Sequence, residues 1–368
     1  MLASIQLAGS AIDNALLKRH LDKELCRVRI TKPEPVQAKT VETFTEYIVR
    51  FIGDAKAGRR LNAKNAQFAD GTLKNFMKYR STLIDFQRTT GHPINFDAFT
   101  LDFYNTFKKY LTTQGLSLNY VGAVLNGVKM LLKQSHRDGL HQCTDFQHRD
   151  FRKIEEEVDT IYLPDDELQN LFDLNLANDA RLDRVRDLFL IGCYTGPRFS
   201  DYSELRPLNI TFGGRILNVT TQKTGARVAI PLNPNVLTIL DKYDGVPPRT
   251  MSNQKFNEYL KELGQRAGLT GPVERTRTQG GIRSTLTAQT WQLLTTHTAR
   301  RSFATNAFLA GLPTISIMKI TGHKSGSQFM KYIKVTGEQN ARLLLAHPHF
   351  SGVATTTPAM VRQLHKVA

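Results

Sequence analysis

The sequence predicts a mainly α-helical protein with a small antiparallel β-sheet, built as a helical domain followed by a mixed α/β domain. Three observations predict this class. Apolar residues recur at helical spacing throughout the front half of the chain. The helical spacing of apolar residues gives way to short β-branched runs, typical of extended structure, within residues 216–232. Between these parts, residues 147–160 are strongly charged and lack apolar periodicity, which indicates an interdomain joint.

The chain length of 368 residues is enough for two or three domains, each with its own core. We expect five segments along the chain. They are an N-terminal helix and linker at 1–40, a helical domain at 41–146, the joint at 147–160, the mixed domain at 161–350 and a tail at 351–368.

Helical stripes dominate the part before the joint. The first predicts a helix over residues 12–28, followed by a Pro- and Lys-rich linker. Four more predict a bundle, and their apolar members are Phe44, Tyr47, Ile48 and Phe51; Leu73, Phe76, Met77 and Tyr79; Phe103, Phe107 and Tyr110; and Val121, Val124, Leu125, Val128 and Leu131. Lysines and arginines occupy the remaining faces. This predicts basic surfaces, with an ordinary solvated bundle as the alternative.

After the joint, helix signals come first. Pro164 is followed by three acidic residues, a combination that favours a helix start. A buried helix is expected over residues 180–194, ended by Gly196 and Pro197.

Extended structure follows. Residues 216–232 contain two β-branched runs around Lys-Thr-Gly-Ala, a pattern typical of a β-hairpin. Asn233 and Ser252 predict the starts of two further helices. Gly322 predicts the end of a helix over residues 313–321.

Charge and cysteine content narrow the class of protein. Lysine and arginine number 49 against 33 acidic residues, giving a net charge of +16 and favouring a polyanionic partner such as DNA. A ribosomal or membrane-surface protein is the alternative, but the basic residues are dispersed among periodic segments. Three cysteines without metal-ligand spacing indicate neither a zinc site nor a disulfide framework. No signal peptide or membrane span is recognisable, so we expect a soluble intracellular protein.

One set of polar residues carries the candidate chemistry. Arg198, His297, Arg300, His323 and Tyr332 bring two guanidinium groups, two imidazoles and a phenol into a mostly apolar region. Arginines can clamp a pentavalent phosphate, histidines can exchange protons, and a phenol can attack. This combination suits phosphodiester cleavage without a metal.

Neighbouring positions refine the set. Asp201 lies three residues after Arg198 and is expected to orient its guanidinium. His297 and Arg300 share one face of a helix, and both are expected to face away from the core. Arg301 is expected to point elsewhere.

In order and spacing, these residues resemble the catalytic set of the tyrosine recombinases, the phage-integrase family, including integrases of conjugative transposons. The resemblance is carried by Thr-Gly-Pro-Arg with an acid three residues later, by HTARRSFAT, and by Gly-His nine residues before a Tyr that precedes a β-branched residue. Only Pro197 departs from the first motif, at its variable position. The resemblance covers about residues 160–345, and the helical half resembles the family's core-binding domain in organisation only.

The resemblance implies the fold of a tyrosine-recombinase catalytic domain and a site-specific recombinase or integrase that acts through a 3′-phosphotyrosine. Tyr332 would be the nucleophile, Arg198 and Arg300 the phosphate ligands, His323 a further donor, and His297 the base or the group that orients the phenol. The family's β-turn lysine would correspond to Lys223, with Arg227 as a poorer alternative because guanidinium groups hardly deprotonate.

The resemblance also implies partners and a location. We expect no cofactor and no metal. Double-stranded DNA is the expected partner, with a homo-tetramer on two recombination sites, a monomer off DNA, and a DNA-bending accessory protein as a candidate partner. No membrane association is expected, and the implied location is the cytoplasm of a bacterial host, at the nucleoid.

Three other functions remain open. A type IB topoisomerase would share the chemistry, and an invertase or transposase of the same family would share every residue named. A catalytically silent DNA-binding regulator is the alternative from a different class. In addition, the apolar stripe of the tail is expected to dock on a neighbouring protomer, and the first forty residues are a coupling helix or an arm-domain remnant.

Overall fold

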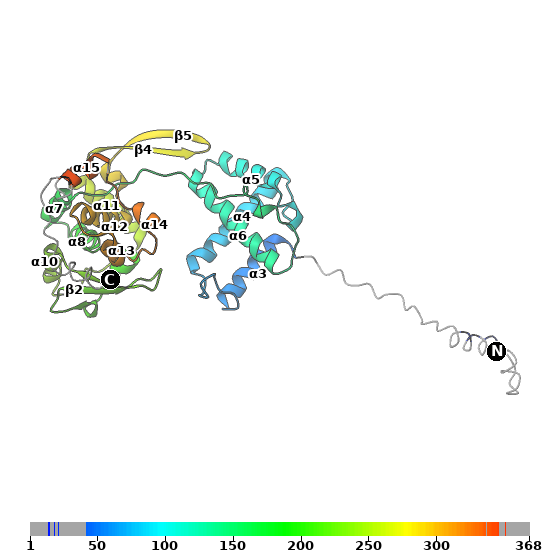
Figure 1. Ribbon diagram of the computed structural model, residues 1–368, viewed down its shortest axis with the longest axis horizontal. Helices are drawn as coiled ribbons and strands as arrows, with labels where there is room; N and C mark the ends of the chain where they lie inside the picture. Colours follow the sequence, from blue (N-terminus) through cyan, green and yellow to red (C-terminus); the bar gives the residue numbers. More distant parts are fainter. Residues whose placement is uncertain are drawn as a thin grey trace, which may run out of the picture. The chain divides into compact units, whose positions relative to one another are not determined.

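The computed structural model describes residues 42–335 and 337–345, together with positions 14, 18, 21 and 350 (Figure 1). The expected linker before residue 41 and the expected tail at 351–368 lie outside the described residues. The chain divides into two compact units. Unit 1 comprises Met1–Gln114 and Tyr120–Ile154, and unit 2 comprises Gly115–Asn119 and Glu155–Ala368.

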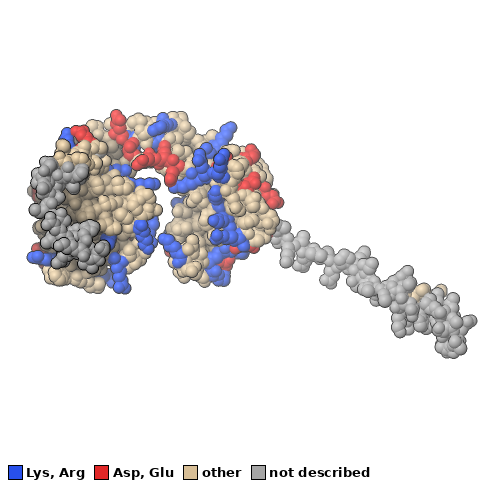
Figure 2. All heavy atoms as spheres, in the orientation of Figure 1, with Lys and Arg blue, Asp and Glu red and all other residues tan. Residues whose placement is uncertain are grey.

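Unit 1 is a helical bundle. Its four long helices are α3 (Phe44–Lys56), α4 (Asp70–Thr90), α5 (Leu101–Thr113) and α6 (Leu118–Arg137), the last of which begins within unit 2. Thr43 and Glu46 form a capping box that satisfies main-chain N–H groups at the start of α3. The four predicted stripes supply the core, except that Met77 is 41% exposed on α4 and Tyr110 is only partly buried on α5. The apolar stripes of these helices therefore form the core of unit 1. Figure 2 shows a band of basic side chains on the visible face of this unit.

Unit 2 surrounds one buried helix. Its helices are α7 (Asp165–Asp173), α8 (Ala180–Thr195), α9 (Phe199–Tyr202), α10 (Pro234–Lys242), α11 (Asn253–Arg266), α12 (Thr296–Leu309), α13 (Thr314–Thr321), α14 (Gly326–Met330) and α15 (Gly337–Leu345). Helix α8 contacts α7, α10, α11 and α12, and almost all its residues from Leu182 onward are buried. Residues 188–193 of α8 are apolar on every side, which places this part of the helix in the core, and the sequence predicts a buried helix over residues 180–194.

A three-stranded antiparallel sheet belongs to unit 2. It runs in the order β1 (Ile210–Thr211), β2 (Ile216–Thr220), β3 (Arg227–Pro231). In the β2–β3 register Val219 pairs with Val228, and alternate residues of both strands are buried. The hairpin predicted within residues 216–232 and the mainly helical class are thereby confirmed. The turn between β2 and β3 contains Lys223.

A second hairpin, not predicted from the sequence, joins α11 to α12. Strands β4 (Pro272–Gln279) and β5 (Ile282–Gln289) pair along their whole length, and Figure 1 shows them as a long two-stranded ribbon. Gly280 and Gly281 form the turn with φ of 59° and 78°, a geometry that a two-residue hairpin loop favours. The strands are polar and lack apolar alternation, so only this Gly-Gly pair signalled the hairpin.

The charged joint is attached to this hairpin by its own carboxylates. The main-chain N–H of Thr276 donates to Asp159 at 3.0 Å, and that of Thr278 donates to Glu156 at 2.8 Å. These bonds satisfy outward-facing donors of β4, which a lone edge strand would otherwise leave open. Asp159 and Glu156 thus hold the end of the joint against β4 of unit 2.

Two glycines end the helices that lead to site residues. Gly196 ends α8 with φ of 81°, and a Cβ atom there would lie 2.3 Å from the ring of Phe303. Gly322 ends α13 with φ of 66°. A left-handed residue at a helix end turns the chain sharply, so these turns place Arg198 and His323 where they are. None of the described helices is long and apolar enough to cross a membrane.

Candidate active site

Unit 2 supplies the six candidate catalytic residues, two of them from the same helix. Arg198 precedes α9, Lys223 lies in the β2–β3 turn, His297 and Arg300 lie on α12, His323 follows α13, and Tyr332 follows α14. The sequence separates the first and last of these by more than 130 positions. Ring and guanidinium contacts bring His297, Arg300, His323 and Tyr332 to one place.

Arg300 is the buried centre of the site. Its side chain is only 1% exposed, so the expectation that it faces away from the core is wrong. Nη1 donates to the carbonyl of Gly196 at 2.9 Å, and Nη2 donates to that of Thr321 at 2.5 Å. Burial, followed by the charge of Arg198, lowers the pKa of Arg300. The helix ends at Gly196 and Thr321 hold the guanidinium, since their last carbonyls lack helical partners.

His323 lies between Arg300 and Thr321. Its Nε2 is 3.2 Å from Arg300 Nη2, and its Nδ1 is 2.8 Å from Thr321 Oγ1. The Thr321 hydroxyl donates to Ile317 at 2.7 Å, so it accepts from Nδ1–H. This assigns the neutral tautomer with the proton on Nδ1, and Arg300 Nη2 lies 3.2 and 3.4 Å from Nε2 and Nδ1, over the face of the ring. Burial, then Arg300 and Arg198, lowers the pKa of His323 to about 4.

Tyr332 packs its ring against these groups. The ring centroids of Tyr332 and His323 are 4.7 Å apart, and those of Tyr332 and His297 are 6.4 Å apart. The guanidinium carbon of Arg300 lies 5.4 Å from the Tyr332 centroid, within cation–π range. The phenol is therefore surrounded by the imidazoles and by one arginine, as a nucleophile beside a phosphate site requires.

Two arginine donors at the site are buried without a hydrogen-bond partner among the described residues, as is Nε of Arg275 on β4. They are Nη1 of Arg198 and Nε of Arg300. An unpaired buried donor on a charged group costs free energy. An anion bound between the two arginines would satisfy both donors, and planar guanidinium groups are suited to phosphate oxygens.

Lys223 and His297 complete the site. Desolvation, then the positive charges of Arg301, Arg300, Arg198 and Lys223, lowers the pKa of His297. The residue is nevertheless exposed to solvent. His297 is accordingly neutral near pH 7 and able to accept a proton. Lys223 is exposed, on the turn between β2 and β3.

Asp201 acts on that turn and forms no ion pair with Arg198 within the described part of the chain. Its Oδ1 accepts from the main-chain N–H of Gln222 at 2.9 Å, and Gln222 in turn donates from Nε2 to the carbonyl of Ser200 at 2.7 Å. The structure therefore corrects the expected role of Asp201. The carboxylate holds the residue next to Lys223 instead of orienting a guanidinium.

Comparison with known families decides the assignment. The model of the phage integrase family matches residues 162–339, and that of the phage integrase SAM-like domain matches residues 43–151. The chain belongs to the phage integrase family of tyrosine recombinases. It is a tyrosine-type site-specific recombinase. No curated protein sequence matches this recombinase.

Solved structures show the same fold at low sequence identity. A lambda integrase dimer bound to a COC′ core site is 18% identical, with a TM-score of 0.56; the match covers 78% of this chain and 97% of that one. The Tn1549 transposon integrase in complex with a circular intermediate DNA is 13% identical, with a TM-score of 0.59 and coverage of 82% and 98%. The recombinase fold thus includes both the helical and the catalytic parts.

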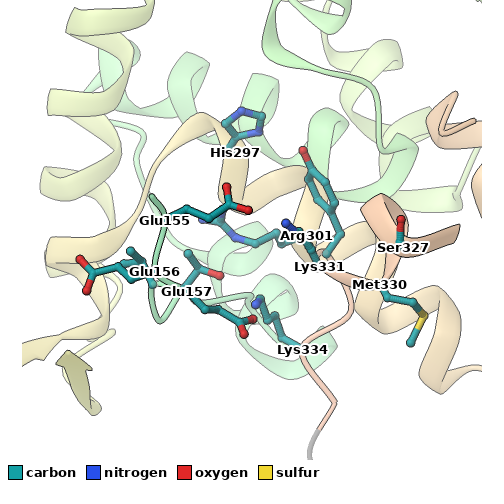
Figure 3. A pocket seen from close by; sticks show the side chains of 12 residues that line it. Glu155, Glu156, Glu157, His297, Arg301, Ser327, Met330, Lys331 and Lys334 are labelled. Atoms are coloured by element: carbon teal, nitrogen blue, oxygen red, sulfur yellow. The ribbon is translucent and has the colours of Figure 1, made fainter. Parts of the chain in front are cut away.

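A pocket of about 620 Å³ opens beside the recombinase's nucleophile. It is lined by His297, Arg301 and Tyr332, by Lys331 and Lys334, and by three glutamates of the joint, Glu155, Glu156 and Glu157. Figure 3 shows the glutamates opposite Ser327 and Met330. Sequence reasoning placed the joint outside the site, because a charged aperiodic segment reveals nothing of what it packs against.

Arg301 also lies in a position that was not predicted from the sequence. It lines the same pocket as His297 and Tyr332, although it was expected to point elsewhere. Its Nε donates to the carbonyl of Ile161 at 2.8 Å, which attaches α12 to the segment before α7. Burial lowers its pKa, and the Tyr332 phenol opposes that change.

The imidazole of His323 is expected to titrate near pH 4 instead of near its ordinary 6.5. Because the folded pKa is lower, the unfolded chain binds more protons between these values. The stability that the neutral ring contributes is full above about pH 6.5 and is lost as the pH falls through 4. NMR titration of ¹⁵N-labelled histidine would measure the midpoint. A midpoint at or above 6.5 would contradict the assigned environment.

Proposed function

We propose that this recombinase cuts and rejoins duplex DNA through a covalent 3′-phosphotyrosine at Tyr332, and that it integrates or excises a mobile element. The observation that carries the proposal is the pair of unpaired, buried arginine donors beside a tyrosine ring flanked by two histidines. A phosphodiester is the anion that uses all of these groups at once. A protein that only binds DNA has no need for a phenol in this position.

Each step can be assigned to a residue. The Tyr332 oxygen attacks the scissile phosphorus while His297 takes the phenolic proton or orients the phenol. Arg198 and Arg300 bind the non-bridging oxygens. The bond to the 5′-oxygen breaks, and Lys223 supplies its proton. The new phosphotyrosine bond conserves the energy of the phosphodiester, so the reverse attack by a 5′-hydroxyl rejoins the strand without a nucleotide cofactor.

His323 has a defined contribution in this scheme. In the neutral tautomer Nδ1–H bonds to Thr321, and the guanidinium of Arg300 packs on the ring, with Nη2 3.2 and 3.4 Å from its two nitrogens. The ring therefore holds the guanidinium before DNA binds. Negative charge from a bound phosphate favours the imidazolium form, in which Nε2–H can donate to a phosphate oxygen.

Duplex DNA and further copies of the chain are the proposed partners. The net charge of +16 favours a polyanion. The folds it resembles include a lambda integrase dimer on a core site and a lambda integrase tetramer on a Holliday junction. We accordingly propose four protomers on two sites, acting on bacterial DNA in the cytoplasm, with a DNA-bending protein as a candidate accessory factor.

Covalent capture of genomic DNA tests the function. Nicked duplexes tiled across the genome around this gene would be incubated with the protein and denatured in detergent. We expect an adduct through a 3′-phosphate on the peptide that contains Tyr332, formed equally in excess EDTA because arginines neutralise the phosphate. Absence of an adduct, a 5′-linkage, or dependence on added magnesium would contradict the proposal. Plasmid relaxation without paired sites would instead indicate a topoisomerase.

The Lys223→Ala variant is expected to cleave ordinary DNA about 10²- to 10⁴-fold more slowly than the wild type, because general acid catalysis is lost. A 5′-bridging sulfur leaves without a proton, so the variant should cleave that substrate at the wild-type rate. Single-turnover cleavage of both substrates measures the difference. Arg227→Ala, on β3, is the matched control and should cleave both normally. Equal impairment of Lys223→Ala on both substrates would assign Lys223 to binding.

A further inference from the structure

Thr305 connects the helix of the phosphate site to the chain that carries the nucleophile. It lies on α12, five residues after Arg300, and its side chain is fully buried. Its hydroxyl donates to the carbonyl of Tyr332 at 3.1 Å and accepts the main-chain N–H of Lys334 at 3.2 Å. One hydroxyl therefore binds the backbone at the nucleophile itself and two residues beyond it.

The hydroxyl of Thr305 differs from the other helical hydroxyls near the site. Thr195, Ser302 and Thr321 each donate to the carbonyl four residues earlier in their own helix. That local bond is the usual one for a threonine or serine inside a helix. Within the described part of the chain, the Thr305 hydroxyl donates instead to a segment 27 positions away.

Among the described residues, the other main-chain hydrogen bonds at Tyr332 and Ile333 are short-range, although the Tyr332 ring also packs on His297, His323 and Arg300. The N–H of Tyr332 donates to Phe329 at 2.8 Å, and that of Ile333 donates to Met330 at 3.2 Å. Both bonds stay within the turn that follows α14. They shape the turn but do not place it relative to Arg300. The two hydrogen bonds of Thr305 also fix the position of this turn relative to Arg300, because Thr305 and Arg300 lie on the same helix, α12.

We infer that Thr305 is a positioning residue that holds the Tyr332 backbone at a set distance from Arg300, the phosphate ligand on α12. The inference rests on Tyr332 being the proposed nucleophile. Attack requires the phenolic oxygen to lie within about 3–3.5 Å of phosphorus and in line, and a displacement of about 1 Å can cost 10²-fold in rate. Thr305 acts through Tyr332 and touches no substrate atom.

The test compares Thr305→Val with Thr305→Ser. Valine keeps the branched shape and removes the hydroxyl, whereas serine keeps the hydroxyl. We expect Thr305→Val to lower single-turnover cleavage by about 10- to 100-fold with DNA affinity unchanged, and Thr305→Ser to restore cleavage close to wild type. Ser302→Ala is the matched control. It removes another buried hydroxyl of α12, which binds Leu163 N–H at 2.8 Å, and should not slow cleavage of the folded protein.

A second measurement applies even if Thr305→Val fails to fold. Hydrogen exchange of the Lys334 amide in the wild-type protein should be slow, and it should stay slow in Ser302→Ala and Thr305→Ser. Fast exchange in the wild type, normal cleavage by Thr305→Val, or equal slowing in Ser302→Ala would each overturn the inference. Failure of the proposed function is distinguishable, because the wild type itself would then form no adduct.

Discussion

The Tyr332→Phe variant is expected to bind DNA normally and to form no covalent adduct. The substitution removes one oxygen and leaves the ring, which packs on His323 at 4.7 Å and over Arg300 at 5.4 Å. The fold and the phosphate site should therefore persist while the attacking atom is absent. Denaturing gels of a nicked suicide duplex measure the adduct, and fluorescence anisotropy measures binding.

Tyr194→Phe is the matched control for this prediction. Tyr194 and Tyr202 are the other tyrosines near the arginine motif, and neither is suited to attack. The Tyr194 hydroxyl accepts from Asn235 at 3.1 Å, and Tyr202 is fully buried. Burial raises the pKa of both phenols, that of Tyr202 well above its usual range. Adduct formed by Tyr332→Phe, or lost in Tyr194→Phe, would show that the nucleophile is misassigned.

The Arg300→Lys variant is expected to lose at least about 10²- to 10³-fold in cleavage rate, the usual cost of one preorganised donor. Lysine keeps the charge but lacks the planar fork. It cannot hold the carbonyls of Gly196 and Thr321 and also present a donor to a phosphate. The carbonyls of Gly196 and Thr321 would lose their donor, which should also lower the stability of the protein by about 1–3 kcal/mol for each unsatisfied group. Single-turnover cleavage and thermal unfolding measure the two effects.

Arg186→Lys separates loss of stability from loss of catalysis. Arg186 is another arginine with little exposure, bound to Asp183 at 2.6 Å and to the carbonyl of Leu174 at 2.7 Å. Its replacement should lower the melting temperature but leave cleavage by the folded protein near the wild-type rate. If Arg300→Lys is destabilised as much as Arg186→Lys but cleaves as well as wild type, Arg300 is only a structural arginine.

Secondary structure was predictable where the sequence has a strong period. The stripes of α3 to α6 and the apolar run of α8 specify buried faces directly, and the β-branched runs around Lys223 specify β2 and β3. The polar β4–β5 hairpin was missed because threonine and arginine on both faces produce no alternation. Met77 was misplaced because a one-residue shift around a helix is 100°, which is enough to move a side chain from core to solvent.

The sequence by itself determined the family, the helical class and the residue types of the site, because motif spacing and apolar period are local properties of the chain. The tertiary structure decided the surroundings of those residues. It buries Arg300 between two helix ends, directs Asp201 to the turn of Lys223, places the glutamates of the joint beside Tyr332, and bonds Thr305 to the nucleophile's backbone. These pairs lie about 20 to 180 positions apart, and contacts at such separations are set by how helices pack, which no local pattern records.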